Sequence, residues 1–145
     1  MAAAQQEWAN RGVERAWDDY TRALEELAAT RTVDVLAHPD VVKVAGHWPA
    51  ATDEFYDRIA EAARSCGLAA ELNSSGWRRP CAEAYPAPAL LDRFRKLGVP
   101  ITTASDGHQR DHVSWRIGDL TAMARAAGYE EVTTFRARRP QSRPL

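Results

Sequence analysis

The chain has 145 residues, which is enough for one domain with a hydrophobic core but short of the roughly 250 that a complete barrel of eight β/α units needs. Hydrophobic residues make up 45% and charged residues 27%, as is typical of soluble globular proteins. The net charge of -1 gives no general attraction to nucleic acid or to an anionic membrane surface. No apolar run approaches the roughly 20 residues that span a bilayer. We therefore expect no nucleic-acid partner and no membrane partner.

The cellular compartment is predicted from the N-terminal sequence and from the cysteines. The first seven residues lack the basic stretch and apolar core of a secretory signal. Cys66 and Cys81 fall in different predicted elements and form no CxxC pair, which favours two free thiols in a reducing environment. Both observations predict a cytoplasmic protein.

Helix-period and strand-like segments alternate along the chain. The predicted helices cover residues 13–27, 52–66, 88–97 and 113–127, and the predicted strands cover 32–37, 68–73, 99–104 and 132–135. Apolar residues recur every three or four positions in each helix. The first helix carries them at Val13, Trp17, Tyr20, Leu24 and Leu27. Strands separated by helices favour βαβ units, so the predicted fold class is α/β with a parallel sheet. Residues 136–145 are rich in Arg and Pro, which favours a disordered tail.

Metal-capable side chains lie near the ends of three successive predicted strands. His38 follows the first strand, Glu71 lies near the end of the second, and Asp106 and His108 follow the third. Because the carboxyl ends of parallel strands meet at one rim, these side chains are expected to lie together. Their nitrogen and oxygen donors suit zinc, manganese or iron. Taken singly, His38 and Asp106 also fit ordinary turns, and Glu71 fits a salt bridge.

The loop after Glu71 carries two adjacent arginines, Arg78 and Arg79, behind the flexible turn at Gly76. Guanidinium groups match phosphate oxygens in a bidentate way, which makes this loop a candidate phosphate clamp. The alternative is a surface loop with solvated arginines. The sequence contains neither a GxxxxGK[ST] loop nor a GxSxG elbow, so a Walker-type site and a serine nucleophile are not predicted.

Four motifs, in order and spacing, resemble the later motifs of PHP-domain phosphoesterases, and most of all those of the histidinol-phosphatase branch. The motifs are residues 33–40, residues 71–76, Tyr85-Pro86 and residues 105–108. The resemblance covers roughly residues 13–135. It implies that residues 1–135 form the C-terminal part of a PHP domain, whose family fold is a distorted, TIM-like (β/α)7 barrel.

The resemblance also implies a function. His38, Glu71, Asp106 and His108 would be ligands of divalent metal ions, the last three also taking part in catalysis, and Arg78 and Arg79 would contact the substrate phosphate. The substrate would be a small phosphorylated molecule. The implied reaction is hydrolysis of L-histidinol phosphate to histidinol and phosphate, a step of histidine biosynthesis.

The chain departs from the family pattern at its start. The family begins with an HxH motif on the first strand, whereas no histidine precedes His38 in this sequence. We therefore expect a partial barrel with an open strand edge, which predicts association into a homo-oligomer. Two alternatives remain. One is a non-catalytic half-barrel that binds metal or a partner, and the other is a different metal-dependent hydrolase, against which the arginine loop argues.

Overall fold

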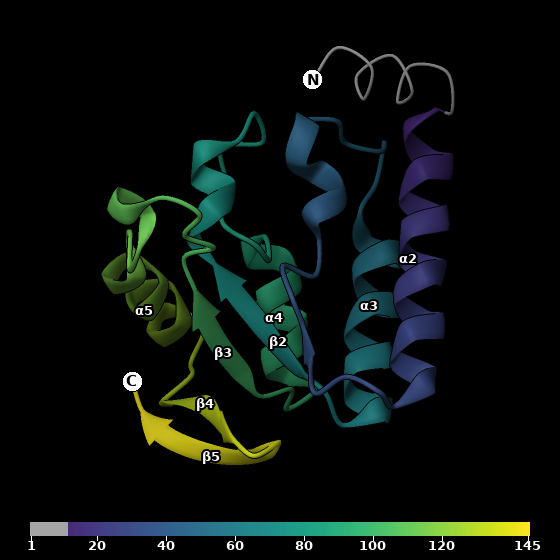
Figure 1. Ribbon diagram of the computed structural model, residues 1–145. Helices are drawn as coiled ribbons and strands as arrows, with labels where there is room; N and C mark the ends of the chain where they lie inside the picture. The colour runs from purple at the N-terminus through teal and green to yellow at the C-terminus, as the bar shows by residue number, and fades with distance from the viewer. Residues whose placement is uncertain (1–11) are drawn as a thin grey trace.

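The computed structural model describes residues 12–145 (Figure 1). The first seven residues, from which we predict the lack of a secretory signal, lie outside this range. The helices are α2 (Val13–Thr30), α3 (Asp53–Cys66), α4 (Pro88–Lys96) and α5 (Ile117–Ala126). The strands are β1 (Val35–Leu36), β2 (Ala69–Asn73), β3 (Ile101–Ala104), β4 (Glu131–Arg136) and β5 (Arg139–Pro144). Three short 3-10 helices are η1 (Val41–Ala45), η2 (Ser74–Arg78) and η3 (Arg110–His112).

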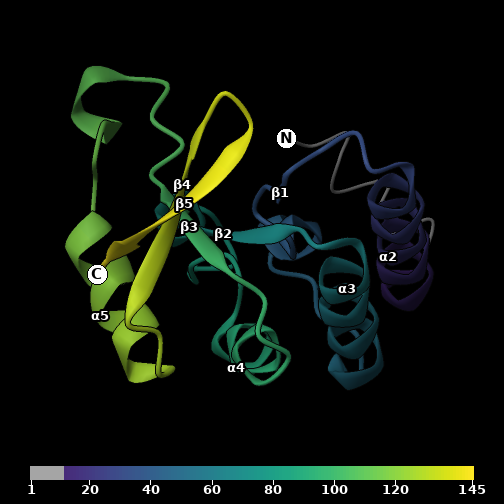
Figure 2. The same cartoon turned by 90° about the horizontal axis from the view of Figure 1, so that it is seen from below.

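Strands β1, β2 and β3 form a parallel sheet in that order, which confirms the predicted α/β class. Helices α3 and α4 lie on one face of the sheet (Figure 2), and the β4–β5 hairpin lies beyond the end of the sheet at which β2 and β3 begin (Figure 1). Side chains alternate along β2. Ala70 and Leu72 pack among the helices, so Glu71 between them points to the opposite face.

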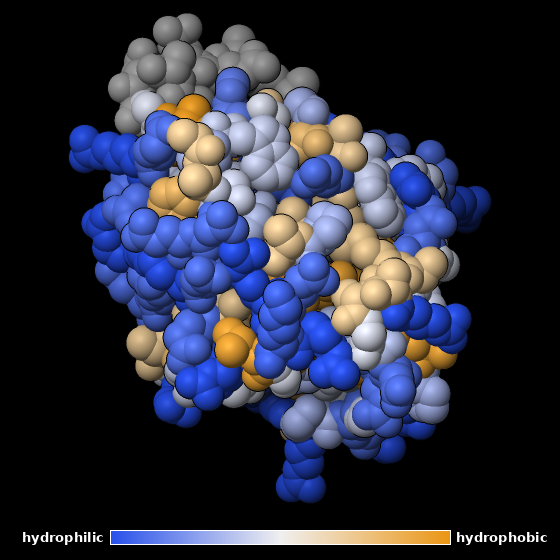
Figure 3. Space-filling view, turned by 180° about the vertical axis from the view of Figure 1, so that it is seen from behind, coloured by the Kyte–Doolittle hydropathy of each residue, from blue (hydrophilic) through white to orange (hydrophobic). Residues whose placement is uncertain are grey.

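The helical face is built around aromatic side chains. Trp17 of α2 is fully buried, and its ring centre lies 5.8 Å from that of Phe55 and 5.9 Å from that of Tyr56, both in α3. Ile59 and Phe94 are also fully buried, each contributing roughly 1.5–3 kcal/mol by leaving water. Hydrophilic side chains dominate the outer surface on this side (Figure 3). Most of the apolar positions read from the sequence pack in the core, whereas Leu27 and Leu97, also placed on those faces, are exposed.

Helix α3 ends where the sequence predicts. Gly67 follows it with φ of 70°, a left-handed conformation that glycine adopts without strain. Its N–H bonds back to the carbonyls of Ala63 and Arg64. Leu68 then enters the sheet and is buried. The glycine thus turns the chain from the helix directly into β2.

The structure differs most from the prediction at three elements. Strand β1 has only two residues, Val35 and Leu36, because Pro39 and η1 follow at once. Helix α5 begins at Ile117 rather than at Val113, since positive φ values at Ser114 and Arg116 interrupt the helix. Strand β4 pairs with β5 and lies outside the parallel sheet.

The prediction of a disordered tail is wrong for Arg139–Pro144, which forms β5. Ala137 and Arg138 both have positive φ, 49° and 62°, as in the two-residue turns that suit hairpins. Antiparallel pairing with β4 then supplies the strand's hydrogen bonds. Arg138 also donates to Asp34 at 2.9 Å, which ties the hairpin to the start of β1. The neighbouring strand, rather than local propensity, orders this segment.

The structure also describes the two cysteines and the character of the helices. Both Cys66 and Cys81 are free, as predicted. A search of residues 12–145 finds no helix with the length and apolarity that crossing a membrane requires.

Arg58 joins α2 to α3 and generates a pH-dependent prediction. Its guanidinium donates to both oxygens of Glu25, at 2.8 and 2.7 Å, and to Asp18 at 2.7 Å. These hydrogen bonds lower the pKa of both carboxyls. A lowered carboxyl pKa contributes stability above the unfolded-state pKa, and that stability is lost as the pH falls through the folded-state pKa. We expect Arg58→Met to lower the melting temperature at about pH 7, and the difference from wild type to shrink between about pH 5 and pH 2.

The measurement is thermal unfolding by circular dichroism over that pH range. Arg64→Met is the matched control, because among residues 12–145 the Arg64 side chain pairs only with Glu61, on the exposed surface of the same helix. It should change the melting temperature less. A difference between Arg58→Met and wild type that stays constant with pH would show that the stem of Arg58, and not its charge, joins the helices.

Candidate metal and phosphate site

The four predicted metal ligands lie at one end of the parallel sheet. The register pairs Asn73 with Ala104, so the carboxyl ends of β2 and β3 lie side by side, and it pairs Leu36, the last residue of β1, with Ala70 near the start of β2. His38 comes two residues after β1, Glu71 lies within β2, and Asp106 and His108 follow β3. The topology therefore delivers all four to the same rim.

His38 and Glu71 form the inner pair. Oε1 of Glu71 accepts the backbone N–H of His38 at 3.2 Å and the side-chain amide of Asn73 at 2.8 Å. Nδ1 of His38 is buried and has no hydrogen-bond partner among the described residues. A buried ring nitrogen without a partner is rare, and it fits a position reserved for a ligand.

Glu71 is half-buried and has no lysine or arginine paired with it within residues 12–145. The sequence leaves two explanations for Glu71, a metal ligand or a salt bridge, and the described residues do not form the salt bridge. Its carboxylate is held by neutral donors, which leaves its negative charge available to a cation.

Asp106 and His108 form the outer pair. Nδ1 of His108 lies 3.5 Å from a carboxylate oxygen of Asp106 and 3.0 Å from its carbonyl oxygen. The His108 side chain is 80% exposed. In the part of the chain that the structure describes, no three His, Cys, Asp or Glu side chains come close enough together to hold a metal ion. The donors thus have the right chemistry and share a rim, but they stand as two pairs rather than as a complete cage.

Both pairs contain a residue in an unusual backbone conformation. His38 has φ of 32° and Asp106 has φ of 48°, in the left-handed region that side chains other than Gly seldom adopt. Strain of this kind costs about 1–3 kcal/mol and collects at functional sites. Of the eight described non-glycine residues with positive φ, two are thus among the four residues singled out from the sequence.

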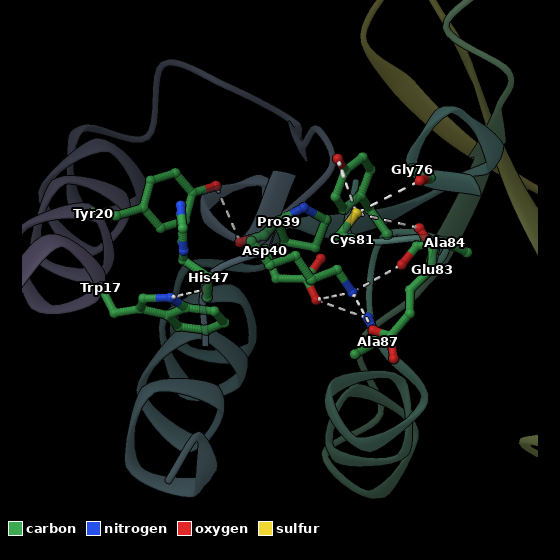
Figure 4. A network of polar contacts seen from close by, with 12 residues as sticks. Trp17, Tyr20, Pro39, Asp40, His47, Gly76, Cys81, Glu83, Ala84 and Ala87 are labelled. Carbon is green, nitrogen blue, oxygen red and sulfur yellow. Dashed lines mark hydrogen bonds and ion pairs between the residues drawn. The ribbon is translucent and has the colours of Figure 1, made fainter. Parts of the chain in front are cut away.

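The loop that carries His38 is anchored by a buried ion pair (Figure 4). Lys43 and Asp40 are both fully buried, and Nζ lies 2.8 Å from Oδ2. Lys43 also donates to the carbonyl of Ala84 at 2.9 Å, and Asp40 accepts the backbone N–H of Ala87 at 2.8 Å. Burial raises the pKa of the Asp40 carboxyl, and the charge of Lys43 opposes that effect. This pair fastens the loop after β1 to the segment that leads into α4.

The two candidate phosphate contacts are placed differently. Arg78 is half-buried and donates through Nη2 to the carbonyls of Ser105, at 2.9 Å, and Asp106, at 3.3 Å. Its Nη1 is buried and without a partner among the described residues. Arg79 is exposed, and its backbone ends η2. The structure therefore brings Arg78, and not Arg79, against the outer donor pair.

Sequence reasoning missed the roles of Lys43, Asp40 and Asn73. A signal for Lys43 exists, because it is the one charge in the apolar run Val-Val-Lys-Val-Ala of η1. A lone charge in such a run needs a partner if the run is buried. Nothing local identifies Ala84 or Glu83 as that partner.

A hollow of about 660 Å³ lies at the other end of the sheet. It is lined by Leu68 and Pro100, which precede β2 and β3, and by Phe135 and Arg138 of the hairpin. None of the predicted site residues lines it, so it is separate from the rim.

The carboxyl rim of the parallel sheet thus carries imidazole, carboxylate and guanidinium groups. No protein-family model matches the chain. The chain is 35% identical, over 136 residues, to a probable histidinol-phosphatase of Deinococcus radiodurans, a match that covers 93% of this chain and 51% of that protein. The chain thus spans about half the length of the curated relative it matches. This similarity confirms the resemblance to histidinol phosphatases that the motifs predict.

A solved structure shares the fold. It is a histidinol phosphate phosphatase of Lactococcus lactis, in complex with zinc, L-histidinol and phosphate. The superposition has a TM-score of 0.69 at 23% sequence identity and covers 90% of this chain and 52% of that one. The described α/β arrangement is therefore that of about half of a histidinol phosphatase chain.

The buried ion pair generates a stability prediction. Lys43→Met leaves the Asp40 carboxylate buried with no cation, so we expect the free energy of unfolding to fall by about 3–5 kcal/mol. The double variant Asp40→Asn with Lys43→Met removes both charges and should recover much of that loss. Urea unfolding followed by fluorescence measures all three proteins.

Lys96→Met serves as the control, because Lys96 is exposed at the end of α4. It should shift the free energy of unfolding by less than about 0.5 kcal/mol. A double variant no more stable than Lys43→Met alone would contradict the coupling of the two buried charges.

Proposed function

We propose that this chain provides one half of a metal-dependent histidinol-phosphate phosphatase. The observation that carries the proposal is the 35% identity to a probable histidinol-phosphatase over nearly the whole chain. It is supported by the donors gathered at the carboxyl rim. The reaction would be hydrolysis of L-histidinol phosphate, a phosphoric monoester, in histidine biosynthesis.

In this proposal His38, Glu71, Asp106 and His108 hold divalent metal. Nδ1 of His38 has no competing partner among the described residues, and Glu71 has no competing cation there. Zinc is the first candidate, since the Lactococcus lactis enzyme binds it, and manganese and iron suit the same donors. A bound metal would supply charge neutralisation at the phosphate and would lower the pKa of a water nucleophile. Arg78, and with less support Arg79, would hold the phosphate oxygens in place.

The chain's share of the fold would be a partial TIM-like barrel. Its sheet has three parallel strands, and the face that carries Glu71 is covered by no helix of the described part. Completion of that barrel requires further strands and further metal donors. A second copy of the chain, or the rest of a longer protein, would supply them, which is the basis for proposing a homo-oligomer. A binding module without catalysis is the second candidate, favoured by the two-pair arrangement of donors.

Two measurements on the purified 145-residue chain test the proposal. The first is zinc or manganese affinity by isothermal titration. The second is phosphate release from L-histidinol phosphate after metal loading. We expect His38→Ala and Glu71→Gln to weaken metal binding at least about ten-fold, because each removes a donor of the inner pair.

His47→Ala is the matched control, since it removes an imidazole of a residue that lies beside Trp17 and Tyr20 (Figure 4) and whose carbonyl accepts the Trp17 Nε1–H at 3.2 Å. It should leave metal affinity unchanged. Turnover that is lost in Glu71→Gln and His108→Ala would establish the phosphatase in this chain. Metal binding without turnover would favour the binding module, and a chain that binds no metal would overturn both candidates.

A further inference from the structure

Two arginines and two tryptophans stack beside the candidate phosphate contact. The guanidinium carbon of Arg78 lies 4.7 Å from the centre of the Trp115 ring, and that of Arg116 lies 3.9 Å from the centre of the Trp77 ring. The two indole rings meet edge to face at 6.5 Å. Trp77 and Arg78 belong to η2, whereas Trp115 and Arg116 lie in the loop between β3 and α5. The stack therefore joins two segments that are distant in sequence.

The backbone on both sides of Trp115 is strained. Ser114 has φ of 60° and Arg116 has φ of 53°. Such values are seldom adopted by side chains other than Gly, and they persist where the surroundings require them. Ser74 donates its hydroxyl to the carbonyl of Trp115 at 2.6 Å, and the N–H of Ser114 bonds to the hydroxyl of Ser105 at 3.0 Å. Trp115 is thus held in place from η2 and from the end of β3.

Trp115 in turn limits how Arg78 can lie. The guanidinium lies over the Trp115 ring, and its Nη2 donates to the carbonyls of Ser105 and Asp106. Contact with an aromatic ring and two hydrogen bonds together restrict the orientation of a planar guanidinium. Of its other nitrogens, Nη1 is buried and has no hydrogen-bond partner in the described part of the chain.

We propose that Trp115 is a positioning residue for Arg78, which it fixes with Nη1 directed at an anionic oxygen of the substrate. The choice of phosphate as that anion rests on the proposed function. The fixed orientation rests on the stack, the two carbonyl contacts and the unpaired nitrogen. Loop closure alone would account for the stack, but it would not account for the unpaired Nη1.

The test uses the metal-free 145-residue chain with inorganic phosphate as the probe. We expect Trp115→Leu to raise the Kd for phosphate about five-fold and Trp115→Phe to raise it less, because the phenyl ring retains a weaker cation–π contact. The Nε–H signal of Arg78 in ¹⁵N spectra should sit apart from the other arginines in wild type and move toward them in Trp115→Leu. Trp48→Leu is the matched control, since Trp48 contacts a different cation, Lys43, at 5.4 Å. It should change neither readout.

The two readouts separate this inference from the proposed function. An unchanged Arg78 signal in Trp115→Leu overturns the positioning role, whether or not phosphate binds. A shifted signal with an unchanged Kd also overturns it. A shifted signal in a protein whose wild type binds no phosphate supports the positioning of Arg78 and overturns phosphate as its ligand. Where Trp115→Leu does not fold, Trp115→Phe carries the test. Its Arg78 signal should move part of the way toward those of the other arginines, and its Kd for phosphate should lie between those of wild type and Arg78→Ala, which lacks the guanidinium.

Discussion

Lys43 lies fully buried in the loop-rich end of the molecule, with its ammonium group 2.8 Å from Asp40 and 2.9 Å from the carbonyl of Ala84. A charge in such a place is tolerated only when it is paired and hydrogen-bonded, because desolvation would otherwise cost several kcal/mol. The pair therefore holds the loop after β1 against the segment Glu83–Ala87. That segment is itself bridged to β2, where Asn73 and Tyr85 exchange backbone hydrogen bonds at 2.6 and 3.0 Å. One buried charge pair thus links the ends of two strands.

The positions of the site residues depend on this link. His38 lies two residues before Asp40 and keeps a left-handed backbone, with φ of 32°. A free loop would relax from that conformation, so the anchor behind it must offset the strain. The N–H of His38 is thereby directed at Glu71, at 3.2 Å, while Nδ1 stays buried without a partner in the described chain. The Asp40–Lys43 pair anchors the loop, and this anchoring offsets the cost of leaving Nδ1 of His38 without a hydrogen-bond partner among the described residues.

The elements of the fold were predictable where local chemistry decides them. Apolar residues at helical spacing and a stop at Gly67 gave α3 correctly, and the placement of His38, Glu71 and Asp106 at strand ends followed from parallel topology. Strand β5 was not predictable, because its residues are mostly Arg, Pro and polar, and only pairing with β4 makes them a strand. The burial of Lys43 was also hidden, since its partners lie up to 41 residues away. The four candidate metal donors form two separate pairs because of the conformations of the loops. Tertiary contacts set these conformations, and no local sequence pattern predicts them.

The Arg78 side chain both holds the loop after β3 and presents a donor at the rim that is unpaired within the described residues. Its Nη2 closes the loop after β3 through two carbonyls, which by itself would make it a structural residue. A guanidinium has five N–H donors, however, and a loop contact satisfies only some of them. The guanidinium also lies over the Trp115 ring, and Nη1 is buried without a hydrogen-bond partner among residues 12–145. A buried donor without a partner is unfavourable, and a bound acceptor would remove that penalty. The contacts that hold the loop therefore also orient a donor at the rim for an anion.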